Sequence, residues 1–229
     1  NKAQKEAVMA TEGPLLILAG AGSGKTKVIA HRISHIIQKG TPPEKILAVT
    51  FTNKAAEEMR NRIKQLLNFN IEGRRSKVKG PFISTFHSLG VFILKHHGNA
   101  LGIPRTFTIL DETDSLKIMK ELVEEMELDP EIYSPERFSS AISRLKNELI
   151  DPSLFSMGAQ SPYETILSQT YAAYETRLLK SKSLDFDDLL LKPVMLFEGF
   201  PDILKHWQNY WQYIHIDEYQ DTNQAQYKL

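Results

Sequence analysis

Three short apolar runs near the start of the chain are each followed by a segment with helical periodicity. The runs cover residues 15–19, 46–51 and 81–85, and their length, β-branched content and flanking turn residues favour strands. After the first run, apolar residues recur at steps of roughly three and four, which is typical of a helix with one buried face; they are Val28, Ile29, Ile33, Ile36 and Ile37. The alternation of strand and helix predicts an α/β fold, a parallel sheet flanked by helices.

A fourth apolar run, residues 213–216, predicts one more strand of the same sheet. It follows the third run only after about 125 residues, whereas a crossover within one sheet is usually a single helix with short loops. The intervening chain contains apolar stripes at helical spacing and a helix start at Ser134-Pro135. We therefore expect an all-helical subdomain inserted into the sheet-bearing domain.

The glycine-rich segment of residues 19–26 joins the first predicted strand to the first predicted helix. Phosphate oxygens need several backbone N–H groups at a helix N-terminus, a lysine to neutralise charge and a hydroxyl for Mg²⁺. The residues in position to bind phosphate are Ala21, Gly22, Ser23, Gly24, Lys25 and Thr26. The segment predicts a P-loop that binds a nucleoside triphosphate, although Ala19 stands where the usual pattern begins with Gly.

Two acids, Asp217 and Glu218, follow the fourth predicted strand. At the carboxyl edge of a parallel sheet they would face the same crevice as the P-loop. We expect Thr26 and Asp217 to hold Mg²⁺, Asp217 through water, and Glu218 to orient and deprotonate the water that attacks the γ-phosphoryl group. Lys25, Asp217 and Glu218 are thus the predicted catalytic residues of an ATP hydrolase.

No arginine finger can be assigned from the spacing. Arg32 and Arg60 lie within the predicted core, and nothing in their positions aims either one at the γ-phosphate. Because an arginine finger supplies much of the rate in such sites, we expect this chain alone to bind nucleotide and hydrolyse it slowly.

Composition narrows the class of protein. Lys and Arg number 28 against 28 Asp and Glu, and 41% of residues are hydrophobic, which excludes a disordered tail and a strongly basic coat protein. Cysteine is absent, so thiolate metal sites and a cysteine nucleophile are excluded. No apolar run approaches the roughly 20 residues that span a bilayer. We expect a soluble cytoplasmic protein without a membrane partner, and a fragment of something longer, since the chain starts without Met and stops within a predicted helix.

Basic residues gather between positions 60 and 79. The segment has seven of them (Arg60, Arg62, Lys64, Arg74, Arg75, Lys77 and Lys79) against Glu72, a net charge of 7 − 1 = +6. It follows a strand of the sheet-bearing domain, where it could collect a phosphate backbone.

Six sequence blocks in this order resemble motifs of the UvrD/Rep/PcrA helicases of superfamily 1. They are residues 1–4, 19–26, 50–59, 85–88, 185–189 and 217–223. The resemblance implies a 3′-to-5′ ATP-dependent DNA translocase with ATP and Mg²⁺ as cofactors. It implies a RecA-like ATP-binding core at residues 1–88 and 197–229, the latter with the Walker B acids, and a helical insertion at residues 89–196. A second RecA-like domain, absent here, would supply the arginine fingers.

The resemblance also implies residue roles. Gln4 would read the adenine edge, and Gln220 would link nucleotide to DNA. The partners would be single-stranded DNA and junctions of single with double strand, with an unknown oligomeric state. The predicted DNA-binding residues are Thr50, Phe51, Thr52, Asn53, Lys54, Thr85, Phe86 and His87.

Reasoning from the residues is consistent with those DNA contacts. Phe51 and Phe86 each follow a strand at the carboxyl edge among small polar residues, and aromatic plates with polar neighbours bind single strands without sequence preference. The alternative for each Phe is a buried core position, and for His87 a structural hydrogen bond.

Other readings stay open on sequence alone. Asp185, Asp187 and Asp188 suggest a two-metal nuclease cluster, but acids at a helix N-terminus suit its dipole and are the preferred interpretation. Lys146 and Asn147 are weak candidates for duplex contacts. The alternatives to a helicase are a helicase-nuclease subunit of the AddA/RecB type, a module that binds nucleotide and DNA without chemistry, and an ATPase with no nucleic-acid role.

Overall fold

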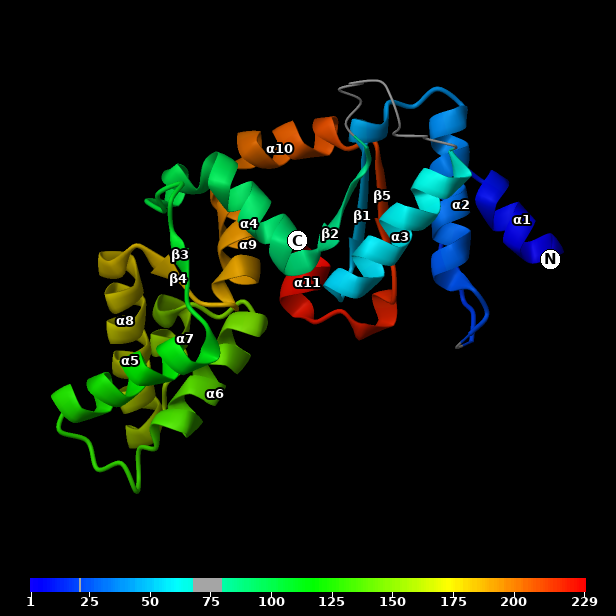
Figure 1. Ribbon diagram of the computed structural model, residues 1–229. Coiled ribbons are helices and arrows are strands. Elements are labelled where there is room, and N and C mark those ends of the chain that lie inside the picture. Colours follow the sequence, from blue (N-terminus) through cyan, green and yellow to red (C-terminus); the bar gives the residue numbers. More distant parts are fainter. Residues whose placement is uncertain (21, 68–79) are drawn as a thin grey trace. The chain divides into compact units, whose positions relative to one another are not determined.

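The computed structural model describes residues 1–20, 22–67 and 80–229 (Figure 1). Contacts divide the chain into two compact units. Unit 1 consists of residues 1–86 and 205–221, and unit 2 of residues 87–204 and 222–229. Each unit is described by itself.

Unit 1 contains a three-stranded parallel sheet in the order β2-β1-β5. The strands are β1 (Ile46–Thr50), β2 (Phe82–Thr85) and β5 (Tyr213–Ile216). Thr50 lies opposite Thr85, and Val49 lies opposite Ile216, so the three strands end at one edge of the sheet. This carboxyl edge is where α/β folds bind ligands.

Helices α2 (Lys25–Gln38) and α3 (Asn53–Leu66) pack beside each other and against the sheet (Figure 1). The Thr52 hydroxyl caps α3 by accepting from the Ala55 N–H at 3.1 Å, and Gly40, with φ of 105°, ends α2. The shared core consists of Ala30, Ile33, Ile36, Ile46, Ala48, Ala56, Met59, Ile63 and Ile83. Both helices and all three strands agree with the elements that the apolar pattern predicts.

The remaining elements of unit 1 are short or peripheral. They are α1 (Lys2–Met9), the 3-10 turns η1 (Pro43–Lys45) and η3 (Tyr219–Asp221), and the larger part of α10 (Pro201–Tyr210), whose first residues belong to unit 2. Helix α1 has no buried residue of its own.

Unit 2 is built mainly of helices. They are α4 (Phe86–His97), which starts at the last residue of unit 1, η2 (Gly98–Leu101), α5 (Glu112–Glu125), α6 (Pro135–Asn147), α7 (Pro152–Gly158), α8 (Pro162–Ser181), α9 (Asp188–Gly199) and α11 (Gln224–Lys228). Its largest core cluster comes from α5, α6 and α8 and includes Met119, Phe138, Ile142, Tyr171 and Tyr174. Two residues in each of β3 (Thr108–Ile109) and β4 (Ser183–Leu184) form a parallel pair, so the insertion is helical except for this ladder.

Helices α4 and α9 approach each other closely at Gly90. A Cβ atom at this position would lie 1.7 Å from the Leu189 carbonyl oxygen, which is far inside van der Waals contact. Glycine is therefore required at this crossing.

The strand predicted at residues 14–20 is wrong. No strand forms there in the described chain, and Leu15, Leu16 and Leu18 are 43%, 67% and 86% exposed. A cavity of 780 Å³ is lined by this segment and by β5, whose Ile214 is 59% exposed. Among the described strands β5 pairs with β1 alone, so it is an edge strand and the apolar segment does not extend the sheet.

The predicted domain boundaries at residues 88/89 and 196/197 stay a prediction, and contacts divide the chain at other residues. Residues 222–229 group with unit 2, because α11 packs on α9 and Lys228 pairs with Glu198 at 3.6 Å. Among the described helices, none is long and apolar enough to cross a bilayer.

Candidate nucleotide and single-strand site

The glycine-rich turn leads directly into the N-terminus of α2. Gly24 is the N-cap residue and has a left-handed conformation with φ of 88°, which a side chain would strain. The Ser23 hydroxyl donates to the Gly20 carbonyl at 2.7 Å and closes the turn. Ala21 lies outside the described residues. The first N–H groups of α2 thus begin at the turn that the sequence assigns to phosphate binding.

Lys25 is the first residue of α2, and its ammonium group faces an acid from the far end of the chain. Lys25 Nζ lies 3.7 Å from Glu218 Oε2, and it donates to the carbonyls of Ala19 and Gly20 at 3.3 and 3.4 Å. The Lys25 side chain is 21% exposed. Long contacts of this kind leave the ammonium group able to exchange partners for an anionic ligand.

Thr26 and Asp217 are joined directly, although 191 residues separate them in sequence. The Thr26 hydroxyl donates to Asp217 Oδ2 at 2.6 Å. Asp217 follows β5, is 4% exposed and donates its backbone N–H to the Val49 carbonyl of β1 at 3.0 Å. The residues predicted to hold the magnesium ion therefore lie in contact, at the carboxyl edge of the sheet.

Glu218 has a strained backbone. Its φ is 53°, a left-handed conformation that costs a residue with a Cβ atom about 1–2 kcal/mol. The Glu218 N–H donates to Asp217 Oδ1 at 3.1 Å, and Gln220 Nε2 donates to Glu218 Oε2 at 2.7 Å. The turn thus aims the Glu218 carboxylate between Lys25 and Gln220, and strain of this kind is typical of functional sites.

Gln4 connects α1 to the glycine-rich turn. Its Nε2 donates to the Ser23 carbonyl at 2.9 Å. Beside it is a cavity of 280 Å³, lined by Asn1, Gln4, Lys5, Val8, Lys27, Val28 and His31. This cavity is next to the phosphate-binding turn and has the amide that the sequence assigns to a base edge.

Neither arginine that was considered as a finger points to this site. The Arg32 guanidinium is buried and donates to the carbonyls of Ala7 and Ala10, and Arg60 Nε donates to the Ile83 carbonyl at 3.3 Å. Burial lowers the pKa of Arg32. Both side chains act as structural links within unit 1.

The residues that follow β1 are mostly accessible. Thr52, Asn53 and Lys54 are exposed and Phe51 is half-buried, whereas Thr50 is buried and donates to the Thr52 carbonyl at 3.1 Å. Asn53 is the first residue of α3, so its N-terminal N–H groups lie in the same region.

The residues that follow β2 are more buried. Thr85 and Phe86 are 7% and 3% exposed, and the Phe86 ring packs edge-on against Phe51 at 5.4 Å between centroids. The geometry of Phe86 is that of a support beneath Phe51. Of the basic segment, Arg62 pairs with Glu58 at 3.0 Å, and residues 68–79 lie outside the described chain.

In unit 2, His87 contacts an aromatic residue that the site prediction did not include. The rings of His87 and Phe186 have centroids 4.5 Å apart, and Phe186 is 57% exposed. Burial lowers the pKa of His87, and the charge of Asp187 offsets part of that effect. The sequence signal for Phe186 was its position between two acids, Asp185 and Asp187, because a large ring flanked by acids is often exposed.

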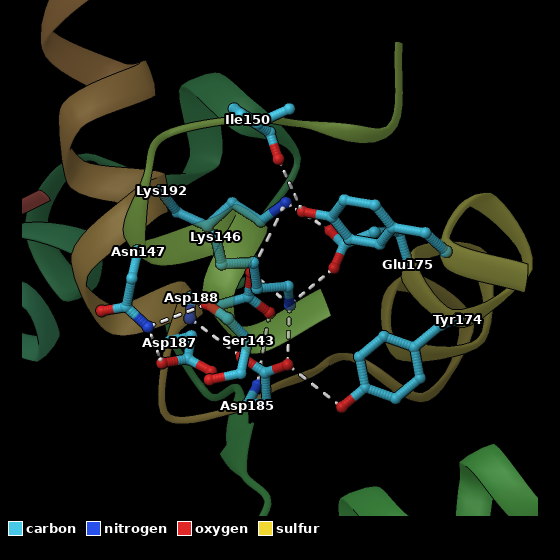
Figure 2. A network of polar contacts seen from close by, with 11 residues as sticks. Ser143, Lys146, Asn147, Ile150, Tyr174, Glu175, Asp185, Asp187, Asp188 and Lys192 are labelled. Carbon is cyan, nitrogen blue, oxygen red and sulfur yellow. Dashed lines mark hydrogen bonds and ion pairs between the residues drawn. The ribbon is translucent and has the colours of Figure 1, made fainter. Parts of the chain in front are cut away.

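The acids around Phe186 belong to a buried ionic network, which Figure 2 shows. Lys146 is fully buried, and its Nζ lies 2.7 Å from Glu175 Oε1, 2.7 Å from Asp185 Oδ2 and 2.9 Å from Asp188 Oδ1. Lys192 pairs with Glu175 at 2.5 Å. The suggestion that Lys146 contacts duplex DNA is therefore wrong, since its ammonium group is buried and paired with these carboxylates.

The same network bears on the nuclease alternative. Asp185 Oδ1 accepts from the Asp188 N–H at 2.9 Å, which caps the start of α9. Among the described residues no group of His and acidic side chains could hold a metal ion. The arrangement agrees with acids at a helix N-terminus, the preferred interpretation of the sequence.

The family model described as UvrD/REP helicase N-terminal domain matches residues 1–229, the whole chain. The chain belongs to the UvrD/REP helicase family. Its α/β unit with a small parallel sheet is consistent with the RecA-like domain of such helicases.

Relatives in the UvrD/REP family extend well beyond this segment. The chain is 46% identical to a protein named ATP-dependent DNA helicase PcrA from Bacillus subtilis, 44% to one from Leuconostoc citreum and 45% to one from Staphylococcus aureus. Each comparison covers 100% of this chain and 30% of the relative. The chain therefore spans under a third of the length of these curated relatives.

Proposed function

We propose that the protein containing this chain is an ATP-dependent 3′-to-5′ DNA helicase and translocase, and that this chain supplies its first nucleotide site and part of its single-strand site. The observation that carries the proposal is the contact of Thr26 with Asp217 beside the contact of Lys25 with Glu218. A phosphate-binding turn and two acids converge there from opposite ends of the sequence. The PcrA relatives, named as ATP-dependent DNA helicases, support this reading.

The residues present fit a magnesium ion. A hydroxyl and a carboxylate oxygen 2.6 Å apart are the hard oxygen ligands that Mg²⁺ prefers, and Asp217 is buried. Thr26 and Asp217 would hold the ion, which when bound supplies charge neutralisation at the phosphates.

The chain's own residues then have separate tasks. Lys25 neutralises phosphate charge, and the α2 N-terminus donates backbone N–H groups. Glu218 accepts the proton of the attacking water, and its bond to Gln220 keeps its carboxylate oriented. Gln4 reads the base from the 280 Å³ cavity.

The DNA-binding part of the proposal has two groups of residues, one in each unit. In unit 1, Phe51 stacks on a base with Phe86 behind it. The residues that bind the sugar-phosphate backbone of the DNA are Thr50, Thr52, Asn53, Lys54 and Thr85. In unit 2, Phe186 and His87 form a second aromatic surface. Exposed rings beside small polar groups bind single strands with little sequence preference.

The isolated chain lacks an assignable arginine finger. Arg32 and Arg60 are engaged with backbone carbonyls, so neither serves as an arginine finger. We expect slow hydrolysis by the isolated chain and fast hydrolysis by the full-length protein, in which a second RecA-like domain supplies the fingers. A helicase-nuclease would differ in having a nuclease domain elsewhere, which a metal-dependent DNA cleavage assay of the full-length protein would reveal.

The nucleotide site is tested by two substitutions in the full-length protein. Lys25→Ala should weaken ATP binding and lower kcat by about 100-fold or more, because a charge partner of the phosphates is lost. Glu218→Gln should leave the Kd for ATP within about two-fold and abolish turnover, because an amide cannot accept the proton. Equal loss of ATP binding in both variants would contradict the role of Glu218. Glu198→Gln, an exposed acid in unit 2, is the matched control for the amide substitution and should leave turnover unchanged.

The single-strand site is tested by the salt dependence of DNA binding. Phe51→Ala should weaken binding by about 1–3 kcal/mol with an unchanged salt slope, since stacking releases few counterions. Lys54→Ala, three residues further on, should lower the slope by about 0.7 if its ammonium group neutralises one phosphate. A steep slope change in Phe51→Ala would contradict stacking.

A further inference from the structure

Asn147, at the last residue of α6, uses both ends of its side-chain amide. Its Nδ2 donates to the Ser143 carbonyl at 2.8 Å and to Asp187 Oδ1 at 2.8 Å. Its Oδ1 accepts from Asn223 Nδ2 at 2.5 Å. Both N–H donors and the oxygen are occupied, so the amide has one defined orientation. Figure 2 shows Asn147 beside Ser143 and Asp187.

One arm of this contact leads to the aromatic surface of unit 2. Asp187 directly follows Phe186, and its charge acts on His87, whose ring packs on Phe186. On both sides of this pair the chain is anchored, because Asp185 and Asp188 are bound to the buried Lys146. The Asn147 bond therefore acts on a short turn whose ends are fixed.

The other arm leads to the segment that follows the catalytic acids. Asn223 caps α11 through a capping box with Gln226, and Ala225 in this helix is fully buried. Only residues 219–222 separate Asn223 from Glu218 in the chain. The residue that donates to Asn147 therefore lies a short covalent path away from the Glu218 turn.

We infer that Asn147 is a positioning residue that couples the nucleotide site to single-strand binding, through Asn223 on one side and the Asp187–Phe186–His87 turn on the other. The inference rests on the proposed function. Coupling between two ligands is reciprocal, so nucleotide must change DNA affinity by the same factor by which DNA changes nucleotide affinity. Asn147 sets the size of that factor and touches neither ligand.

The test, in the full-length protein, exchanges the hydrogen-bond donor at position 147 with the acceptor at position 187. Asn147→Asp keeps an acceptor for Asn223 but places a second carboxylate against Asp187. The coupling factor, the ratio of Kd values for an oligo(dT) strand with and without a non-hydrolysable ATP analogue, should fall from the roughly 5–150-fold usual for allosteric pairs towards one. The double variant Asn147→Asp with Asp187→Asn restores the hydrogen bond between positions 147 and 187 in reversed order, without the bond to the Ser143 carbonyl, and should recover most of the factor.

Controls separate a positioning role from loss of structure. Asn99→Asp adds the same charge at an exposed position in unit 2 and should leave the factor unchanged. Each variant is checked by its thermal unfolding in far-ultraviolet circular dichroism. A folded Asn147→Asp protein with wild-type coupling overturns the inference, as does a loss that the swap does not recover.

The wild-type protein distinguishes this inference from the proposed function. If it binds ATP and single-stranded DNA with no mutual effect, the inference fails and the proposed function stands. If it binds no single-stranded DNA under any nucleotide condition, the proposed function itself fails.

Discussion

The two units each have a lysine that faces carboxylates, and the two lysines are built for opposite purposes. Lys146 is fully buried in unit 2 with three carboxylate oxygens at 2.7–2.9 Å. Lys25 in unit 1 is 21% exposed, and its nearest carboxylate oxygen, on Glu218, is 3.7 Å away. The first lysine is saturated by its own chain, whereas the second retains capacity for a ligand. The difference separates a charge that maintains the fold from a charge that we propose binds a phosphate ligand.

The close carboxylates around Lys146 change the pKa values of the groups in this cluster. Burial alone would lower the pKa of Lys146, but Asp188, Asp185 and Glu175 outweigh it and raise that pKa well above its ordinary value. Burial raises the pKa of Asp188 to about 7 despite the nearby lysine. Lys192 is the second cation of the cluster and lies 2.5 Å from Glu175 and 3.7 Å from Asp188.

The largest expected effect comes from removing the buried cation. Lys146→Met should destabilise unit 2 by about 3–5 kcal/mol, because the acids lose their partner and stay buried. Urea unfolding followed by circular dichroism at 222 nm would measure it, since most helices of the chain belong to unit 2.

Lys120→Met is the matched control for that prediction. Lys120 also lies in unit 2 and pairs with Glu136 at 3.6 Å, but both side chains are 58% exposed, so we expect a change below about 0.5 kcal/mol. Equal losses in the two variants would contradict the distinction between saturated and exposed lysines.

The sequence predicted much of unit 1 because its signals are local. Strands β1, β2 and β5 and helices α2 and α3 each have the apolar spacing and end residues of their type, such as Thr52 before α3. The convergence of Lys25 with Glu218 was predictable too, since a parallel sheet brings the ends of its strands to one edge.

The rest depended on contacts that no local pattern contains. Lys146 and Asp185 are 39 residues apart and on different elements, so their spacing in the sequence does not predict an ion pair. Residues 14–20 show the reverse case, a strand-like pattern that forms no strand in the described structure. Motifs along the sequence were enough to predict a nucleotide site, whereas the buried ion pairs could be found only in the folded structure.

A smaller effect is expected on the stability of unit 1 as the pH is lowered. Burial, and after it the charge of Arg32, lowers the pKa of His215 in β5 to about 4, against about 6.5 in an unfolded chain. As pH falls from 6.5 towards 4 the unfolded state binds a proton that the folded state does not, so stability is lost over that window. From pH 7 to pH 5 this amounts to about 2 kcal/mol for unit 1.

Fluorescence can follow unit 1 alone, because both tryptophans of the chain, Trp207 and Trp211, belong to it. Urea midpoints from tryptophan emission should fall between pH 7 and pH 5 in the wild type. In His215→Gln, which has no titrating group there, most of that fall should disappear, and a slope that persists would assign the pH effect to other residues.

The smallest expected effect is on the stability of unit 1 when Lys25 loses its charge. Lys25→Met should change the free energy of unfolding, measured by tryptophan fluorescence, by less than about 0.5 kcal/mol, because a 3.7 Å partly exposed pair contributes little. Added ATP should raise the urea midpoint of the wild type and not that of the variant, since a ligand stabilises only a fold that binds it. A loss of several kcal/mol without ligand would make Lys25 a structural cation like Lys146.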